Sequence, residues 1–268
     1  MLSFEKIQRL MGPKADQMVD LDGLMELLLH QVPYFYQQGL LTAEFLRSAF
    51  SIDRLAARQI FVQEPDDCFV ADSITGNYLV VGGQVSQRAE QAHGFFLPGT
   101  HATVWAGSGD FLGSATGVLQ GRSSGAAYHQ AQVTARDESC LTLHDEAFGV
   151  VTDNAQGTAA DACSVQVSSY GRLTVGGTAF FLARQWAEVT ASGQAFGLVC
   201  DEVELTCAST NRVIPMGLSV SISCPEPNLV EAMPVSRQLW DELMILSART
   251  LSVPKRKEAL KRLYPNWG

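Results

Sequence analysis

Apolar and small polar residues alternate without a break from Met216 to Cys224. Successive side chains of a strand point to opposite sides, so this pattern predicts a half-buried strand and excludes the apolar stripe of a helix. Cys224 keeps step with the apolar positions of the segment. The same alternation can be used to judge which side chains of the other strands face a core.

The segment from about 67 to 225 consists of short β-prone runs punctuated by glycine, with 19 of the 23 glycines between Gly76 and Gly217. Such a pattern is typical of many strands joined by tight turns. We see no interposed helical segments of the kind that a parallel α/β sheet requires. The pattern therefore predicts an α+β protein with an antiparallel β-sandwich or barrel at about 67–225, flanked by N-terminal and C-terminal helices.

Helical periodicity occurs at both ends of the chain. We expect a helical segment at 1–61, a β-rich domain at 62–227 and C-terminal helices at 228–268. The motif Phe95-Phe96-Leu97 recurs 85 residues later as Phe180-Phe181-Leu182, which indicates either two similar β-units or two unrelated hairpins. Near the C-terminus, Ser236 is the expected N-cap of a helix whose apolar stripe is Leu239, Trp240, Leu243, Met244 and Leu246.

The composition is that of a soluble globular protein, with 46% apolar and 18% charged residues. A net charge of −9 argues against nucleic-acid binding, because phosphate contacts need a basic surface. The first residues lack the features of a secretory signal, and no apolar run is long enough to span a bilayer. We therefore expect a cytoplasmic protein whose six cysteines are reduced thiols.

The phase of each strand divides the cysteines. Cys163, Cys207 and Cys224 fall on apolar faces, where cysteine acts as a small hydrophobe. Cys140 and His144 instead share the polar face of one strand and form a candidate nucleophile–base pair. On a regular strand they would lie about 13 Å apart, beyond hydrogen-bond reach, so only a bend would bring them together.

The histidines give no local metal motif. There is no His-x-His pair, and we predict neither a metal site nor a cofactor. His129 alternates in phase with Ala127 and Val133, which predicts a core histidine. His101 and His129 stay candidates for a catalytic site assembled from distant strands, together with Cys140 and His144.

Two further motifs invite comparison with known sites. Gly121-Arg122-Ser123-Ser124-Gly125 fits the Gly-x-Ser-x-Gly pattern of a nucleophile elbow, but a β-like segment follows it where the elbow needs a helix, so a hairpin loop is expected. Arg54 and Arg58, followed by Asp72-Ser73 and Gly76, resemble the phosphate-binding motifs of PilZ-type cyclic-dinucleotide barrels. The acid is displaced by one position and the resemblance covers about 25 residues. It implies cyclic-dinucleotide binding by the two arginines.

The basic run Lys255-Arg256-Lys257, continued by Lys261 and Arg262, is a second candidate binding surface, for an anionic partner or for the acidic body of a neighbouring copy. Because acids, bases and nucleophiles are scattered, the leading hypothesis is a non-catalytic β-scaffold. Such a scaffold would serve as an interaction, assembly or small-ligand-binding module, with a protein partner or self-association. The alternatives are the enzyme with a dispersed site and, third, the PilZ-like binder.

Overall fold

The computed structural model describes residues 21–208, 211–215, 221–223 and 228–229, in which a group of short helices precedes a long series of strands. The helices are α2 (Leu21–His30), α3 (Val32–Gln37), α4 (Ala43–Ala49) and α5 (Ile52–Ala57). The strands are β1 (Ile60–Val62), β2 (Cys68–Val70), β3 (Gly76–Gln87), β4 (Ala92–Val104), β5 (Ser108–Phe111), β6 (Thr116–Leu119), β7 (Ser124–Ala127), β8 (Gln132–Ala135), β9 (Cys140–Leu143), β10 (Phe148–Val151), β11 (Gln156–Ala159), β12 (Ser164–Val167), β13 (Arg172–Val175), β14 (Phe180–Ala183), β15 (Glu188–Ala191), β16 (Phe196–Val199), β17 (Glu204–Cys207), β18 (Arg212–Pro215), β19 (Ser221–Ser223) and β20 (Asn228–Leu229).

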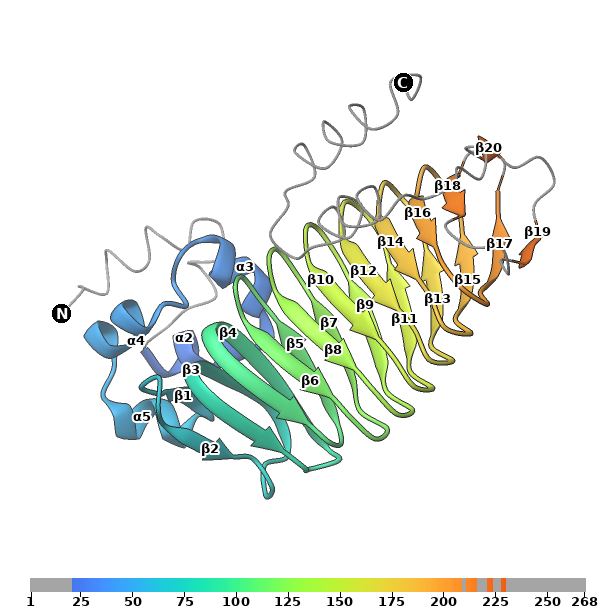
Figure 1. The fold of residues 1–268 in the computed structure, drawn as a ribbon. Helices are drawn as coiled ribbons and strands as arrows, with labels where there is room; N and C mark the ends of the chain where they lie inside the picture. Colours follow the sequence, from blue (N-terminus) through green and yellow to red (C-terminus); the bar gives the residue numbers. More distant parts are fainter. Residues whose placement is uncertain (1–20, 209–210, 216–220, 224–227, 230–268) are drawn as a thin grey trace.

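The strands wind into a parallel β-solenoid of about ten turns, drawn from end to end in Figure 1. From β4 to β18, each strand pairs in parallel with the strand two places further along, so β8 pairs with β10 and β9 with β11. Even-numbered strands from β6 onward form one sheet, odd-numbered strands from β5 onward form the other, and the long β4 contributes to both. The expected antiparallel β-sandwich or barrel is therefore wrong. A parallel neighbour needs a crossover, and here the crossover is a strand of the opposite sheet instead of a helix.

The unit of the solenoid is eight residues long from Ser108 to Pro215. In a typical unit, such as the one that begins at Gln132, the second and fourth residues of the strand point inward and the first and third point outward. Four corner residues then lead to the opposite sheet. Two units make one 16-residue turn. The Phe-Phe-Leu motif that recurs after 85 residues is not part of this repeat, because Phe96 and Phe181 occupy different positions of their strands.

In each corner between β5 and β17, the second residue has a positive φ, which turns the chain from one sheet to the other. Glycine, aspartate and asparagine adopt this conformation at the least cost. Aspartate or glycine fills most of these positions, and an aspartate carboxylate binds the backbone of the preceding turn where it occurs at Asp137 and Asp145. The positions are Gly113, Gly121, His129, Asp137, Asp145, Asp153, Asp161, Ser169, Gly177, Gln185, Gly193 and Asp201.

The core between the two sheets is thin and continuous. Small buried residues such as Ala131, Ala147 and Cys163 end the corners, and aliphatic or aromatic side chains fill the strands. Where a strand carries glycine at an inward position, a large neighbour takes the space: Leu143 lies against Gly149, and Phe181 against Gly197. The core is therefore built by exchange of volume between neighbouring strands, across the two sheets for Leu143 and Gly149 and between adjacent turns for Phe181 and Gly197.

The N-terminal helices cover one end of the solenoid, as Figure 1 shows for α2, α4 and α5 beside β1 and β3. Thr42 and Ser51 are the N-caps of α4 and α5, and each side-chain oxygen accepts a backbone N–H three residues further on. Helix residues such as Leu28, Phe35 and Leu46 form a second core with strand residues of β3 and β4. The first 20 residues of the helical segment expected at 1–61, and the helix expected from the apolar stripe at 239–246, lie outside the described residues.

Candidate functional site

The outer surface of the odd-numbered sheet carries a column of five threonines, one in each of five consecutive turns. Strand pairing places each threonine directly beside the next, 16 residues away. Neighbouring strands of a sheet lie about 4.8 Å apart, so the hydroxyls repeat at that interval along the solenoid. Four of the five are exposed and the first is half-buried. They are Thr142, Thr158, Thr174, Thr190 and Thr206.

A second outward column runs parallel to the threonines and is charged over its C-terminal part. Arg172, Glu188 and Glu204 are exposed neighbours in this column, and the Arg172 Nε lies 3.0 Å from the Glu188 carboxylate. Exposed ion pairs of this kind contribute little stability. The Arg172 and Glu188 side chains are 63% and 53% exposed, so both are accessible to a partner.

Two exposed aromatic side chains lie at equivalent corners of two successive turns, each just before a strand that begins with a residue of the charged column. Tyr170 is 60% and Trp186 is 53% exposed, and their rings stack with centroids 5.5 Å apart. The Trp186 indole N–H donates to the Glu202 carboxylate on the next turn. Exposed aromatic rings are enriched at binding surfaces, so this corner extends the polar face with a stacking platform.

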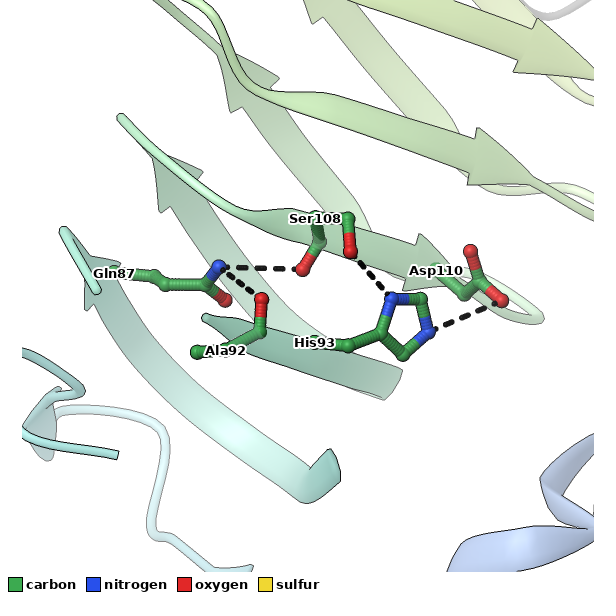
Figure 2. A network of polar contacts seen from close by, with 5 residues as sticks. All are labelled: Gln87, Ala92, His93, Ser108 and Asp110. Atoms are coloured by element: carbon green, nitrogen blue, oxygen red, sulfur yellow. Dashed lines mark hydrogen bonds and ion pairs between the residues drawn. The ribbon is translucent and has the colours of Figure 1, made fainter. Parts of the chain in front are cut away.

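A histidine lies between a hydroxyl and a carboxylate at the N-terminal end of the same sheet (Figure 2). His93 Nδ1 is 2.7 Å from the Ser108 Oγ, and His93 Nε2 is 3.6 Å from the Asp110 carboxylate. The side chains of His93 and Asp110 are 29% and 21% exposed. An open depression of about 480 Å³ lies beside Ser108 and is also lined by Arg122 and Ser124.

The backbone beside this cluster is held by hydrogen bonds of the Gln87 side chain. The buried Gln87 side chain donates from its Nε2 to the carbonyls of Ala92, Ala106 and Ser108, at 2.9–3.2 Å, two of which Figure 2 shows. Its Oε1 accepts a 2.6 Å hydrogen bond from the Tyr78 hydroxyl. One amide therefore ties the first turns together directly beneath His93.

His101, one of the predicted catalytic candidates, lies on the opposite sheet. It is exposed, and its Nδ1 is 2.8 Å from the Thr116 Oγ1 on the next turn. The contact has the same geometry as that of His93 with Ser108. A histidine of β4 thus contacts a hydroxyl residue of the next turn on each of the two sheets, and the neighbouring carboxylate is what distinguishes His93.

His129 is not the core histidine that its phase predicted. Its φ of +60° turns the side chain away from the interior, and it is half-buried against Tyr36, with ring centroids 5.1 Å apart. Its Nδ1 is buried without a hydrogen-bond partner. The ring lines an apolar pocket of about 590 Å³ between α3 and the solenoid, together with Leu41, Val81 and Pro98.

Cys140 and His144 are both outward-facing, as predicted, but they make separate contacts. Cys140 is exposed in the column beside the threonines, with Ser124 and Gln156 as strand neighbours. His144 stacks on Tyr128 at 4.9 Å and lies 3.9 Å from the Asp161 carboxylate. Burial, with Asp110 and Asp145 nearby, raises the pKa of the Tyr128 hydroxyl.

The candidate arginines Arg54 and Arg58 lie on helix α5 and at its C-terminal end. Arg58 pairs with Glu26, and Arg54 lies in the first turn of α5, in the group of helices that covers the solenoid end. The parallel solenoid is also not the barrel that the PilZ resemblance implies. The basic residues Lys255, Arg256 and Lys257 lie outside the described residues.

The remaining expectations about chemistry can be compared with the structure. Cys163 and Cys207 are buried as predicted, whereas Cys224 lies outside the described residues. Ser123 of the Gly-x-Ser-x-Gly match is 1% exposed at a solenoid corner, so no nucleophile elbow is present there. Among the described residues, no group of three or more metal-ligating side chains occurs.

The sequence reasoning missed the threonine column and the His93 cluster. The signal for the column was available, since threonine recurs at every sixteenth position from 142 to 206.

Within the part of the chain that the structure describes, no helix is long and apolar enough to cross a membrane. No family model, curated protein or solved structure matches the chain.

Proposed function

We propose that the protein is a non-catalytic binding scaffold that holds an extended polar polymer along the outer surface of its odd-numbered strands. The observation that carries this proposal is the register-aligned column from Thr142 to Thr206. A periodic surface contacts a periodic ligand with the same group in every turn. Once the polymer is bound at one turn, contacts with each further turn add to the affinity without a further loss of the polymer's overall translational and rotational freedom.

The chemistry of the surface favours a linear polysaccharide. Each threonine hydroxyl can donate and accept hydrogen bonds, which suits a ligand that is itself rich in hydroxyls. The stacked rings of Tyr170 and Trp186 offer an apolar platform for a sugar ring at the edge of the same face. Glu188 and Glu204 beside the column, and the net charge of −9, favour a neutral or cationic polymer over an anionic one.

Affinity electrophoresis with soluble polysaccharides tests this proposal. Neutral hydroxyethyl cellulose and cationic chitosan are the probes, and anionic alginate is the charge control. We expect one of the first two to retard the protein, and the triple variant T158A/T174A/T190A to lose that retardation. The matched control T103A/T116A/T134A removes three hydroxyls from the other sheet and should migrate like the parent. Equal mobility of the parent with and without both probes would contradict the proposal.

A second candidate function is hydrolysis at Ser108, and the observation that favours it is the contact of His93 with both Ser108 and Asp110. A histidine held by a carboxylate can take the proton of a hydroxyl nucleophile. The same histidine–hydroxyl contact recurs at His101 and Thr116 without a carboxylate, which makes binding the better-supported function. Turnover of p-nitrophenyl esters by the parent, abolished in both S108A and H93A but retained in T116A, would establish the hydrolase instead.

A further inference from the structure

The first strand of the even-numbered sheet has an open edge. Strand β2 pairs with the second half of β3, and among the described strands it has no partner on its other side. At the same end of the solenoid, helices α4 and α5 pack on β1, the first strand of the odd-numbered sheet (Figure 1). The described helices therefore cover the end of one sheet, whereas Cys68 and Val70 at the end of the other are exposed.

The backbone of β2 presents unpaired hydrogen-bonding groups along this edge. The carbonyl of Asp67 and the N–H of Ala71 each form a 2.8 Å hydrogen bond with β3. The backbone groups of alternate residues in a strand point to opposite sides, so those of Cys68 and Val70 point away from β3. Neither residue has a backbone hydrogen bond within the part of the chain that the structure describes. The edge is thus fixed on one side and free to pair on the other.

The side chains of β2 indicate what a further strand would contact. Val70 is 57% exposed, and Cys68 is exposed on the same outer side of the sheet. On the inner side, the half-buried rings of Phe61 and Phe69 pack against the end of the core, with centroids 4.1 Å apart. An added strand would continue this alternation, with an apolar residue against the two rings and β-branched residues outside.

Carboxylates flank the edge at both ends. Asp66 and Asp67 precede β2, Asp72 follows it, and all three are exposed. The Asp67 carboxylate accepts the backbone N–H of Glu64 at 2.9 Å. The side chains of Asp66 and Asp72 have no hydrogen bond or ion pair with any residue of the described ranges. Basic residues on both sides of a partner's strand would therefore meet unpaired carboxylates.

The same charges disfavour a second copy of the chain as the partner. If β2 paired with its own copy in an antiparallel arrangement centred on Phe69, Cys68 would lie opposite Val70 and Asp66 opposite Asp72. Like charges directly opposite each other destabilise a sheet. The edge therefore favours a strand from another protein over self-association.

We propose that the edge of β2 docks an extended segment of another protein, which adds a strand to the even-numbered sheet. The segment has an apolar residue at its centre, a β-branched residue on each side and Lys or Arg beyond them. This pattern is the same in both directions, so it suits a parallel or an antiparallel strand. Because the threonine column lies on the other sheet, the proposal is independent of the proposed polymer binding.

Fluorescence anisotropy with a labelled peptide tests the docking edge. The probe has the sequence KKTFTKK, and a second peptide has the same sequence with N-methyl groups on its three central amides. We expect saturable binding of the first peptide and at least about tenfold weaker binding of the second, which has the same charge but cannot pair as a strand. No saturable binding of the first peptide, or equal binding of the two, would overturn the proposal.

Variants of the edge separate strand pairing from charge attraction. Val70→Pro removes an N–H that faces the open side and should weaken binding about tenfold, whereas Val70→Thr keeps the N–H and should bind like the parent. D66N/D72N should weaken binding, more strongly at low salt, and the control E146Q/D153N removes the same charge elsewhere and should not. Equal affinities of the two Val70 variants, or of the two charge variants, would contradict the docking edge.

Hydrogen exchange of the parent locates the bound peptide and does not depend on any variant. The peptide should slow the exchange of the Cys68 and Val70 amides about tenfold and leave the strands of the threonine column unchanged. Slowing confined to other segments would place the peptide elsewhere. Protection of these two amides that grows with protein concentration in the absence of peptide would also overturn the proposal, by assigning the edge to a second copy.

Discussion

The ring of Phe181 occupies the space that Gly197, its neighbour in the next turn, leaves open. The two residues are direct partners in the pairing of β14 with β16, and a Cβ atom at position 197 would overlap the ring. The pair shows how the thin core is packed, because a large side chain in one turn depends on the absence of a side chain in the next.

Gly197→Ala should therefore reduce the free energy of unfolding by about 1–3 kcal/mol through overpacking. The double variant F181A/G197A should be destabilised by less than the sum of the two single variants, because each change relieves the other. Urea denaturation measures all three. Gly176→Ala is the control, since a Cβ there would lie 3.2 Å from the Ser192 Oγ and meet no ring. Additive effects of F181A and G197A would mean that the two sites are independent.

The corner aspartates connect successive turns. Asp145 has a φ of +56°, and its carboxylate accepts the backbone N–H of His129 at 3.0 Å. Asp145→Ala should cost about 1–2 kcal/mol, since it removes the acceptor and leaves a side chain that disfavours a positive φ. Asp145→Asn keeps both properties and should be nearly neutral, with Asp145→Gly between the two. Alanine and asparagine variants of equal stability in urea would contradict this account of the corner.

Tyr78 makes stability depend on pH in the alkaline range. Burial raises the pKa of its hydroxyl well above the ordinary value of 10.0. The folded protein therefore keeps a proton that the unfolded chain releases above about pH 10, so the free energy of unfolding falls as the pH rises through that value. Tyr78→Phe should remove this part of the slope. At neutral pH it should cost about 1–3 kcal/mol, because Gln87 loses its buried donor. Unfolding curves from pH 8 to 11 that keep the same slope in Y78F would assign the titration to other groups.

The described cysteines should divide by reactivity. Cys68 and Cys140 are exposed, whereas Cys163, Cys200 and Cys207 are buried. Burial, with a contribution from Asp201, also raises the pKa of the Cys200 thiol to about 12. Since the thiolate is the reactive form, iodoacetamide at pH 8 should modify Cys68 and Cys140 and spare the other three. Peptide mapping by mass spectrometry shows the sites, and modification of Cys200 in the folded protein would contradict its burial.

Local alternation predicted which side chains face inward more accurately than it predicted the fold. Cys163 and Cys207 were placed in the interior, and Cys140 and His144 on an outer face, as the structure has them. The prediction that His129 lies in the core was wrong. Its position alternates in phase with Ala127, but a positive φ at the corner turns its side chain outward. Period-two alternation shows that a segment is a strand but contains no information about its neighbours.

Whether neighbouring strands run parallel or antiparallel depends on contacts between residues 16 positions apart. The sequence of a single strand does not show these contacts. The aspartates at 137, 145, 153 and 161 mark the eight-residue unit, and the threonines mark the turn. Reading these spacings along the chain would have predicted a parallel solenoid. The cluster of His93 with Ser108 and Asp110 could not be found in the same way, because it depends on the irregular first turns, where β4 bends between the two sheets.

Because every unit from Ser108 to Pro215 contains eight residues, the length of the molecule can change only in fixed steps. Deletion of one residue would exchange the interior and exterior positions of every later strand unless a corner absorbed it. Deletion of sixteen would join equivalent corners and shorten the body by one strand spacing, about 4.8 Å. The gene can thus be lengthened or shortened by whole turns, and a change of one turn between Cys140 and Cys207 would add or remove one threonine of the column.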